Sequence, residues 1–231
     1  MKKTAKALLI VLCAVMLVAG SVLGTLAYLT DHSSVENTFT VGNVDIKVDE
    51  KEVNPDGTPT GEDDDRVEAN EYHLIPGQTY VKDPTMTVIK GSEEAYVRML
   101  VTVTHIDQLK AIFGDDFLPE NYVEGWDKEK WECVGITETS VTINHIPVKS
   151  AVYEFRYYTT VDAYEAEKDI VLEALFTAFT LPGEITGVEL ATISDLVISV
   201  EGHAIQAATF ADADAAWDAF DVQYEDNSAN P

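Results

Sequence analysis

A two-residue alternation of apolar and polar side chains over residues 95–105 constrains the fold of this chain more than any other feature. Apolar residues occupy the odd-numbered positions Val97, Met99, Val101 and Val103, and polar residues occupy the even-numbered positions Arg98, Thr102 and Thr104. Successive side chains of a β-strand point to opposite faces, so this pattern is typical of a strand with one buried face. The segment therefore predicts a half-buried β-strand.

Other segments have the same β-type composition. They are rich in valine, isoleucine, threonine and aromatic residues, and they span 44–48, 126–134, 140–146, 151–160 and 195–200. The apolar run 170–180 fits a strand or a helix by periodicity alone, and the turn at Pro182 and Gly183 favours a strand for its second half. Helical spacing of apolar residues predicts a short helix over 106–113 and another over 210–220.

These segments together predict the fold class. About eight or nine strands with frequent turns and few helices are typical of a sandwich or jelly roll. The strands do not alternate with helices, which disfavours a parallel α/β sheet. We expect a mainly β protein, a jelly-roll-like antiparallel β-sandwich with short helices, after an N-terminal signal helix. Residues 28–231 are expected to form one domain.

The N-terminus has the pattern of an export signal. A lysine-rich start precedes an uncharged stretch over 7–27, and small residues near its end favour cleavage between Ala27 and Tyr28. Residues 1–27 are therefore predicted to be a signal peptide, and the mature protein to be secreted. The same stretch is long enough to span a bilayer, which needs about 20 apolar residues, so a retained anchor is the alternative.

Charge and cysteine content narrow the function classes. Cleavage would remove three lysines and no acidic residue, leaving 12 basic and 41 acidic residues, a formal charge of −29 over 204 residues. Nucleic acids and anionic membranes attract cationic surfaces, so neither is an expected partner. Cys133 would be the one cysteine left, which excludes an intramolecular disulfide. Stability must then come from apolar packing, and a chain of this size can bury roughly 70% of its unfolded surface.

The sequence contains no recognisable catalytic motif. The HExxH zinc motif, the GxSxG and SxxK nucleophile motifs, and the GxGxxG and Walker phosphate loops do not occur. The histidines are scattered, and for His105 and His203 a packing role is favoured over a metal-ligand role. We therefore expect no enzyme activity and no cofactor.

Residues 49–70 carry two prolines, two glycines and a cluster of charges, which predicts a solvated acidic loop. The carboxylates at 62–65 are contiguous, whereas an EF-hand loop spaces its acidic ligands at alternate positions. A loop that binds no ion is favoured, and calcium at this loop is the alternative.

Three segments carry a family resemblance. LAYLTDHSSVENTFTVGNVDIKVDE at 26–50 has an aromatic residue just after the cleavage point and an F-x-x-G-x-hydrophobic-Asp-hydrophobic element at 39–46. LIPGQTYVKDPTMTVIKGSEEAYVRMLVTV and GHAIQAATFADADAAWDAF follow at 74–103 and 202–220. Taken together, they resemble the SipW-dependent signal-peptide proteins, a family with TasA-like biofilm fibre proteins and camelysin-like proteins among its members.

The resemblance implies export through a SipW-type signal peptidase, a jelly-roll β-sandwich, and a place at the cell surface or in the biofilm matrix. It also implies assembly with like subunits or family paralogues by donor-strand exchange, in which an N-terminal segment completes a sheet of the next subunit. Residues 28–40 would be the donor strand, starting at Tyr28 and offering Val35 and Phe39 to fill pockets. The alternative, equally weighted, is an ordinary first strand of the chain's own domain.

Two other functions stay open at this point. Camelysin-like members of the family are described as metalloproteases, although this sequence departs from every metalloprotease motif and no catalytic residue carries over. A monomeric surface adhesin would bind a glycan or a host protein through exposed aromatic residues. The candidates for such a surface are Trp126, Tyr153, Tyr157 and Tyr158.

Overall fold

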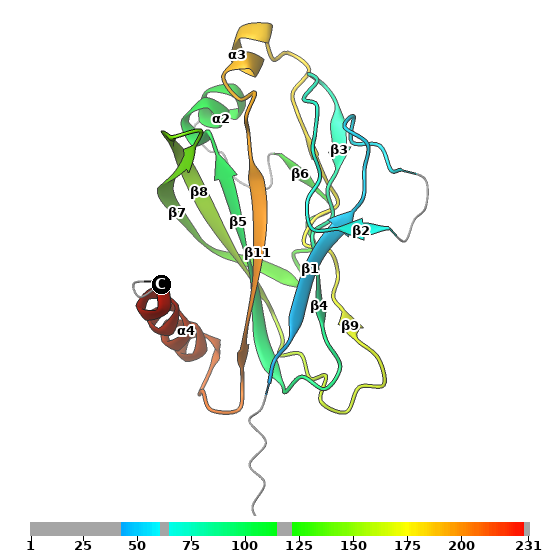
Figure 1. Ribbon diagram of the computed structural model, residues 1–231, viewed down its shortest axis with the longest axis vertical. Coiled ribbons are helices and arrows are strands. Elements are labelled where there is room, and N and C mark those ends of the chain that lie inside the picture. Colours follow the sequence, from blue (N-terminus) through cyan, green and yellow to red (C-terminus); the bar gives the residue numbers. More distant parts are fainter. Residues whose placement is uncertain (1–42, 61–64, 115–121, 229–231) are drawn as a thin grey trace, which may run out of the picture. The chain divides into compact units, whose positions relative to one another are not determined.

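The structure is a computed structural model that describes residues 43–60, 65–114 and 122–228 (Figure 1). The chain divides into two compact units, Met1–Val41 and Gly42–Pro231, and all described residues belong to the second. The expected signal peptide, the cleavage site at Ala27 and Tyr28, and the donor-strand candidate 28–40 therefore lie outside the described residues.

The described residues form a mainly β structure, as predicted, and its strands pair in antiparallel fashion. One four-stranded sheet has the order β2 (Arg66–Val67), β1 (Ile46–Lys51), β4 (Thr85–Val88), β9 (Ile170–Val171). A second has the order β11 (Ile198–Gln206), β5 (Ala95–Thr104), β8 (Ile146–Tyr157), β7 (Trp131–Ile143). A three-stranded sheet has the order β3 (Thr79–Val81), β10 (Ala178–Thr180), β6 (Val123–Glu124).

The described helices are short or peripheral. They are α2 (Ile106–Phe113), α3 (Gly187–Ala191) and α4 (Ala213–Ser228). The prediction for 106–113 is confirmed, and the helix predicted over 210–220 exists but begins at Ala213 and runs on to Ser228. Helix α3 was not predicted, although Thr186 and Glu189 form a capping box at its start.

Strand β5 confirms the alternation on which the fold prediction depended. Its apolar residues Val97, Met99 and Val103 are all at most 1% exposed and belong to the main core. The opposite face is covered at Arg98, which is 3% exposed, whereas Leu100 and Thr102 on the same face are half-buried. Helix α4 lies over the Arg98 side chain, so the face that the sequence predicts to be solvated carries a helix (Figure 1).

The contact between α4 and the sheet combines charge with aromatic packing. The Arg98 guanidinium carbon lies 4.4 Å from the centre of the Trp217 ring and 5.1 Å from that of the Phe220 ring. The same guanidinium forms ion pairs with Asp221 of the helix and with Glu154 of β8. Cation–π contacts and charge pairing therefore hold the C-terminal helix to the sheet.

Strands β7 and β8 form a long hairpin whose turn lies inside a segment predicted as one strand. The paired residues nearest the turn are Ile143 and Ile146, and the loop between them consists of Asn144 and His145 with φ angles of 49° and 68°. Two left-handed residues in a two-residue loop form the type I′ turn. The prediction placed a strand across this turn, over 140–146, because the sequence lacks the glycine that usually marks such a loop.

The predicted acidic loop 49–70 begins too early, because β1 continues through Lys51. Asp49 and Glu50 are 6% and 4% exposed, so both carboxylates are buried within a strand. Arg66 and Val67 at the other end of the segment pair with β1 as β2. A run of charged residues predicts a solvated loop only when its side chains have no oppositely charged partners. Here Arg66 pairs with Asp49, and Lys82 pairs with Glu50.

Strand β11 approaches β1 and β4 closely at Gly202. A Cβ atom on this residue would lie 2.4 Å from Cγ2 of Val48 and 2.8 Å from Cε of Met86. At this level the two four-stranded sheets are therefore in direct van der Waals contact.

Replacing Gly202 with alanine should lower the free energy of unfolding by about 1–3 kcal/mol, because the added methyl group overpacks the contact. Urea unfolding of the variant measures the loss. Gly135 of β7 is the matched control, since a Cβ atom there meets nothing within 4 Å. Equal losses in the two variants would show that β11 does not lie against Val48.

Candidate functional site

Strand β11 has an open edge. It pairs with β5 alone among the described strands. The amide of Thr104 donates to the carbonyl of Val197, and the amide of Ala207 donates to that of Glu94, so the odd-numbered residues turn their backbone groups toward β5. Alternate residues of an antiparallel strand face opposite neighbours. The backbone groups of Ile198 and Val200 therefore face away from β5, toward the open edge.

Strand β1 lies beside β11 and has a second open edge (Figure 1). The amide of Ile89 donates to the carbonyl of Asp45, which places the odd-numbered residues of β1 on the β4 side. On the other side β2 pairs only with Glu50 and Lys51. The backbone groups of Ile46 and Val48 are thus left without a described strand partner, and they border the space next to β11.

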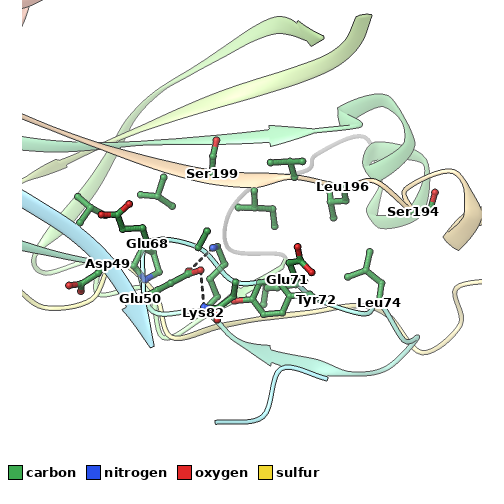
Figure 2. Close-up of a pocket in the computed structure, with 18 residues that line it drawn as sticks. Asp49, Glu50, Glu68, Glu71, Tyr72, Leu74, Lys82, Ser194, Leu196 and Ser199 are labelled. Atoms are coloured by element: carbon green, nitrogen blue, oxygen red, sulfur yellow. Dashed lines mark hydrogen bonds and ion pairs between the residues drawn. The ribbon is translucent and has the colours of Figure 1, made fainter. Parts of the chain in front are cut away.

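A groove of about 520 Å³ lies between these two edges, shown in Figure 2. Its walls come from four segments of the chain and from Phe179 of β10. The lining residues in the four segments are 48–50, then 68–72 and Leu74, then Lys82 and Pro84, and finally Ser194 and 196–200. Because β1 and β11 touch at Gly202, the groove is closed at that end and widens away from it.

Side chains along the groove are arranged in layers. Val48 and Val200 form an apolar layer next to the closed end. Figure 2 shows Glu50 and Lys82 further along, and beyond them Leu74 lies at the wide end together with Leu196 and Ser194. Among the buried and half-buried side chains, the order from the closed end to the wide end is therefore apolar, polar, apolar, and the exposed side chains of Glu68 and Glu71 also line the groove.

The polar layer is a buried ion pair with its hydrogen bonds satisfied. Nζ of Lys82 lies 2.6 Å from Oε2 of Glu50, and both side chains are 6% exposed. Nδ2 of Asn70 donates to Oε1 of Glu50 over 3.0 Å. Every buried polar side-chain atom of the described residues has a hydrogen-bond partner. The layer thus presents fixed charge and amide groups between two apolar layers of the groove.

Tyr72 forms part of the groove floor next to this pair. Its ring centre lies 5.9 Å from Nζ of Lys82, and its hydroxyl donates to the carbonyl of Val81 over 3.1 Å. Burial raises the pKa of Tyr72 well above its usual value, and the charge of Glu50 raises it further. The hydroxyl therefore stays protonated and acts as a hydrogen-bond donor rather than as a base.

A second charge cluster fixes β2 against β1 at the rim. Nε of Arg66 lies 2.5 Å from Oδ1 of Asp49, and its Nη1 lies 3.0 Å from Oδ2 of Asp83. Burial acts to raise the pKa of Asp49, but the hydrogen bonds from Lys47 and Arg66 outweigh it and hold the pKa below the usual range. Of this cluster, Asp49 also lines the groove.

The depressed pKa of Asp49 predicts a pH dependence of stability. A carboxylate with a lowered pKa in the folded state stabilises the protein above its unfolded-state pKa, near 3.9 for aspartate, and loses that effect as the pH falls through the folded-state value. The Asp49→Asn variant should be less stable than the unchanged protein at pH 6, and the difference should shrink below about pH 4. Urea unfolding across this range measures it. A gap for Asp49→Asn that does not change with pH would contradict the charge-based explanation.

The histidines singled out in the sequence have structural partners. His105 lies before α2 with a φ of 57°, and its Nε2 is 3.0 Å from Oδ1 of Asp195. His203 lies under α4, where Arg98 donates to its Nδ1 over 3.2 Å and its Nε2 is 3.0 Å from Glu201. No group of three or more histidine, cysteine, aspartate or glutamate side chains suited to a metal ion occurs in the part of the chain that the structure describes.

The aromatic residues proposed for an adhesin surface do not gather into one. Tyr153 is 1% exposed and belongs to the core. Trp126 packs edge-on against Phe155, and the hydroxyl of Tyr157 donates to Glu173. Tyr158 is 55% exposed. Most of this set therefore serves packing.

The candidate site residues named from the sequence and the groove residues are different sets. Ala27, Tyr28, Val35 and Phe39 lie outside the described residues, as do positions 62–64 of the acidic run. The groove itself was not foreseen. A signal for it was available in β11, whose sequence over 198–206 has neither lysine nor proline to protect an edge.

The described residues contain no helix that is both long enough and apolar enough to cross a membrane. Models of known protein families, curated proteins and solved structures were all compared with this chain, and none of them matches it.

Proposed function

We propose that this protein is a structural subunit of an extracellular matrix or cell-surface fibre, which assembles when an extended segment of one copy adds a strand in the groove of another. The observation that supports this best is the pair of open edges on β1 and β11, bordering a partly apolar groove that no described strand fills. A strand placed there would satisfy backbone donors and acceptors on both sides.

The chain carries a segment suited to that role. Residues 28–40 precede the first described strand, and they include Val35 and Phe39 among polar neighbours. Main-chain hydrogen bonds would supply affinity, and apolar side chains in the groove would supply specificity. The same proposal includes the jelly-roll arrangement of the sandwich, export with removal of residues 1–27, and residence outside the cell, all of which the family resemblance supports.

The acidic composition fits a subunit that must stay dispersed until it assembles. A formal charge of −26 over the whole chain makes separate copies repel one another in solution. An open, unprotected edge would otherwise pair with any exposed strand. Charge repulsion keeps separate copies apart, and the groove accepts one particular segment. Together they favour assembly through one defined contact.

N-terminal sequencing of exported protein, followed by electron microscopy of the same preparation, tests the proposal. We expect a start at Tyr28 together with filaments. Protein that is exported and cleaved but remains monomeric under all tested calcium and pH conditions would overturn it. Casein hydrolysis that a chelator inhibits, or glycan binding by monomers, would point to the protease or adhesin function instead.

A further inference from the structure

Residues 28–40 are called the arm below. The layers of the groove specify which residues of the arm the groove accepts and in which direction the arm runs. We propose that residues 35–39 of a second copy lie antiparallel to β11, with Val35 beside Val200, Asn37 beside Ile198 and Phe39 beside Leu196. This inference rests on the proposed function and assigns the register of the contact.

The alternation in the arm matches the order of layers. In an extended strand, residues 35, 37 and 39 point to one face, and residues 36, 38 and 40 point to the other. The first set reads valine, asparagine, phenylalanine, and the second reads glutamate, threonine, threonine. Within 28–40, no other set of three alternate residues places one polar side chain between two apolar ones. The arm therefore has one face that fits an apolar, polar, apolar groove.

Asn37 suits the polar layer because it is neutral and can both donate and accept. The layer already contains one positive and one negative side chain, Lys82 and Glu50, each 6% exposed. A third buried charge would lack a counter-ion and cost several kcal/mol. An amide, in contrast, can donate to the Glu50 carboxylate alongside Asn70, which donates to it over 3.0 Å.

The width of the groove sets the direction of the arm. Phe39 needs the wide end, where Leu74 and Leu196 line the groove. The closed end offers no comparable depth, because β11 lies against Val48 at Gly202. With Phe39 at the wide end and Val35 at the closed end, the arm runs antiparallel to β11, which is also the favourable pairing for strands at an edge.

The same geometry favours a second copy over the chain's own arm. An own arm that turned back beside β1 would have to turn before Asn43, whose carbonyl accepts from the amide of Glu93. A two-residue loop at 41 and 42 would then place Phe39 opposite Val44. That position lies beyond the contact of Gly202 with Val48, outside the groove. The own arm would also run parallel to β11.

Disulfide trapping between two separately labelled chains tests this register. One chain carries Asn37→Cys and the other Ile198→Cys, both with Cys13 and Cys133 replaced by alanine, and the exported proteins are mixed before assembly and oxidation. Facing residues of paired strands have Cα atoms about 5.5 Å apart, within the range of a disulfide. With the two chains mixed in equal amounts, we expect about half of the filament protein to form the mixed crosslinked dimer, because an Asn37→Cys arm meets an Ile198→Cys groove in one contact of two.

The matched control carries Thr38→Cys, whose side chain would face outward, and it should crosslink at least tenfold less. Filaments that form without the Asn37–Ile198 crosslink, or that trap Thr38 equally well, would overturn the register while leaving the fibre proposal intact. A chain carrying both cysteines that crosslinks only within itself would show that the arm fills its own groove. Absence of filaments in the unsubstituted protein would instead overturn the proposed function.

Discussion

Replacing Phe39 with aspartate is expected to abolish filament growth at protein concentrations that polymerise the unchanged chain. In the proposed contact, the variant would lose the burial of a phenylalanine side chain, worth about 2–3 kcal/mol, and would place a charge in an apolar layer. The concentration of monomer in equilibrium with filaments should rise at least about 100-fold, because each 1.4 kcal/mol changes an equilibrium constant tenfold. Sedimentation of assembled protein measures that concentration.

The Thr38→Asp variant is the control for this prediction. It adds the same charge one residue away, on the face of the arm that would point to solvent in the proposed contact. Its effect on the monomer concentration should be small, within about threefold, since exposed charges interact weakly. If both aspartate variants block assembly equally, general repulsion and not the fit of Phe39 would explain the result.

The second large effect is expected in the polar layer of the groove. Lys82→Met should lower the free energy of unfolding by about 3–5 kcal/mol, because it leaves the Glu50 carboxylate buried without its cation. The double variant Lys82→Met with Glu50→Leu should recover most of that loss, since it removes both charges. Urea unfolding monitored by circular dichroism compares the three proteins.

An exposed ion pair provides the control. Lys47 is paired with Asp49, and its side chain is 55% exposed. Lys47→Met should therefore change stability by no more than about 1 kcal/mol. If Lys82→Met is equally mild, or if the double variant is no more stable than the single one, the Lys82–Glu50 pair is not the closed, buried contact described above.

Local patterns in the sequence predicted the elements that such patterns control. The alternation of Val97, Met99 and Val103 identified a strand whose buried face does line the core. Helical spacing and Gly114 at the end located α2 at Ile106–Phe113. These predictions succeeded because the side-chain period of a strand or helix is set by neighbouring residues and needs no knowledge of the rest of the chain.

Features that depend on distant partners were missed. The buried position of Glu50 depends on Lys82, 32 residues away. Arg98 is covered by Trp217 and Phe220 of a helix more than a hundred residues further along the chain. The groove combines four separate segments with Phe179, so no window of the sequence contains it. The sequence predicted a segment that could act as a donor strand, and only the structure revealed a groove in which such a segment could bind.

The most direct test of the central claim separates the arm from the body and recombines them. A chain that begins at residue 41 should remain monomeric, and a synthetic peptide of residues 28–40 should bind it with one-to-one stoichiometry in a calorimeter. Binding should disappear when Ile198 is replaced by lysine in the groove. A chain without the arm that still forms filaments, or a folded body that does not bind the peptide, would contradict the account.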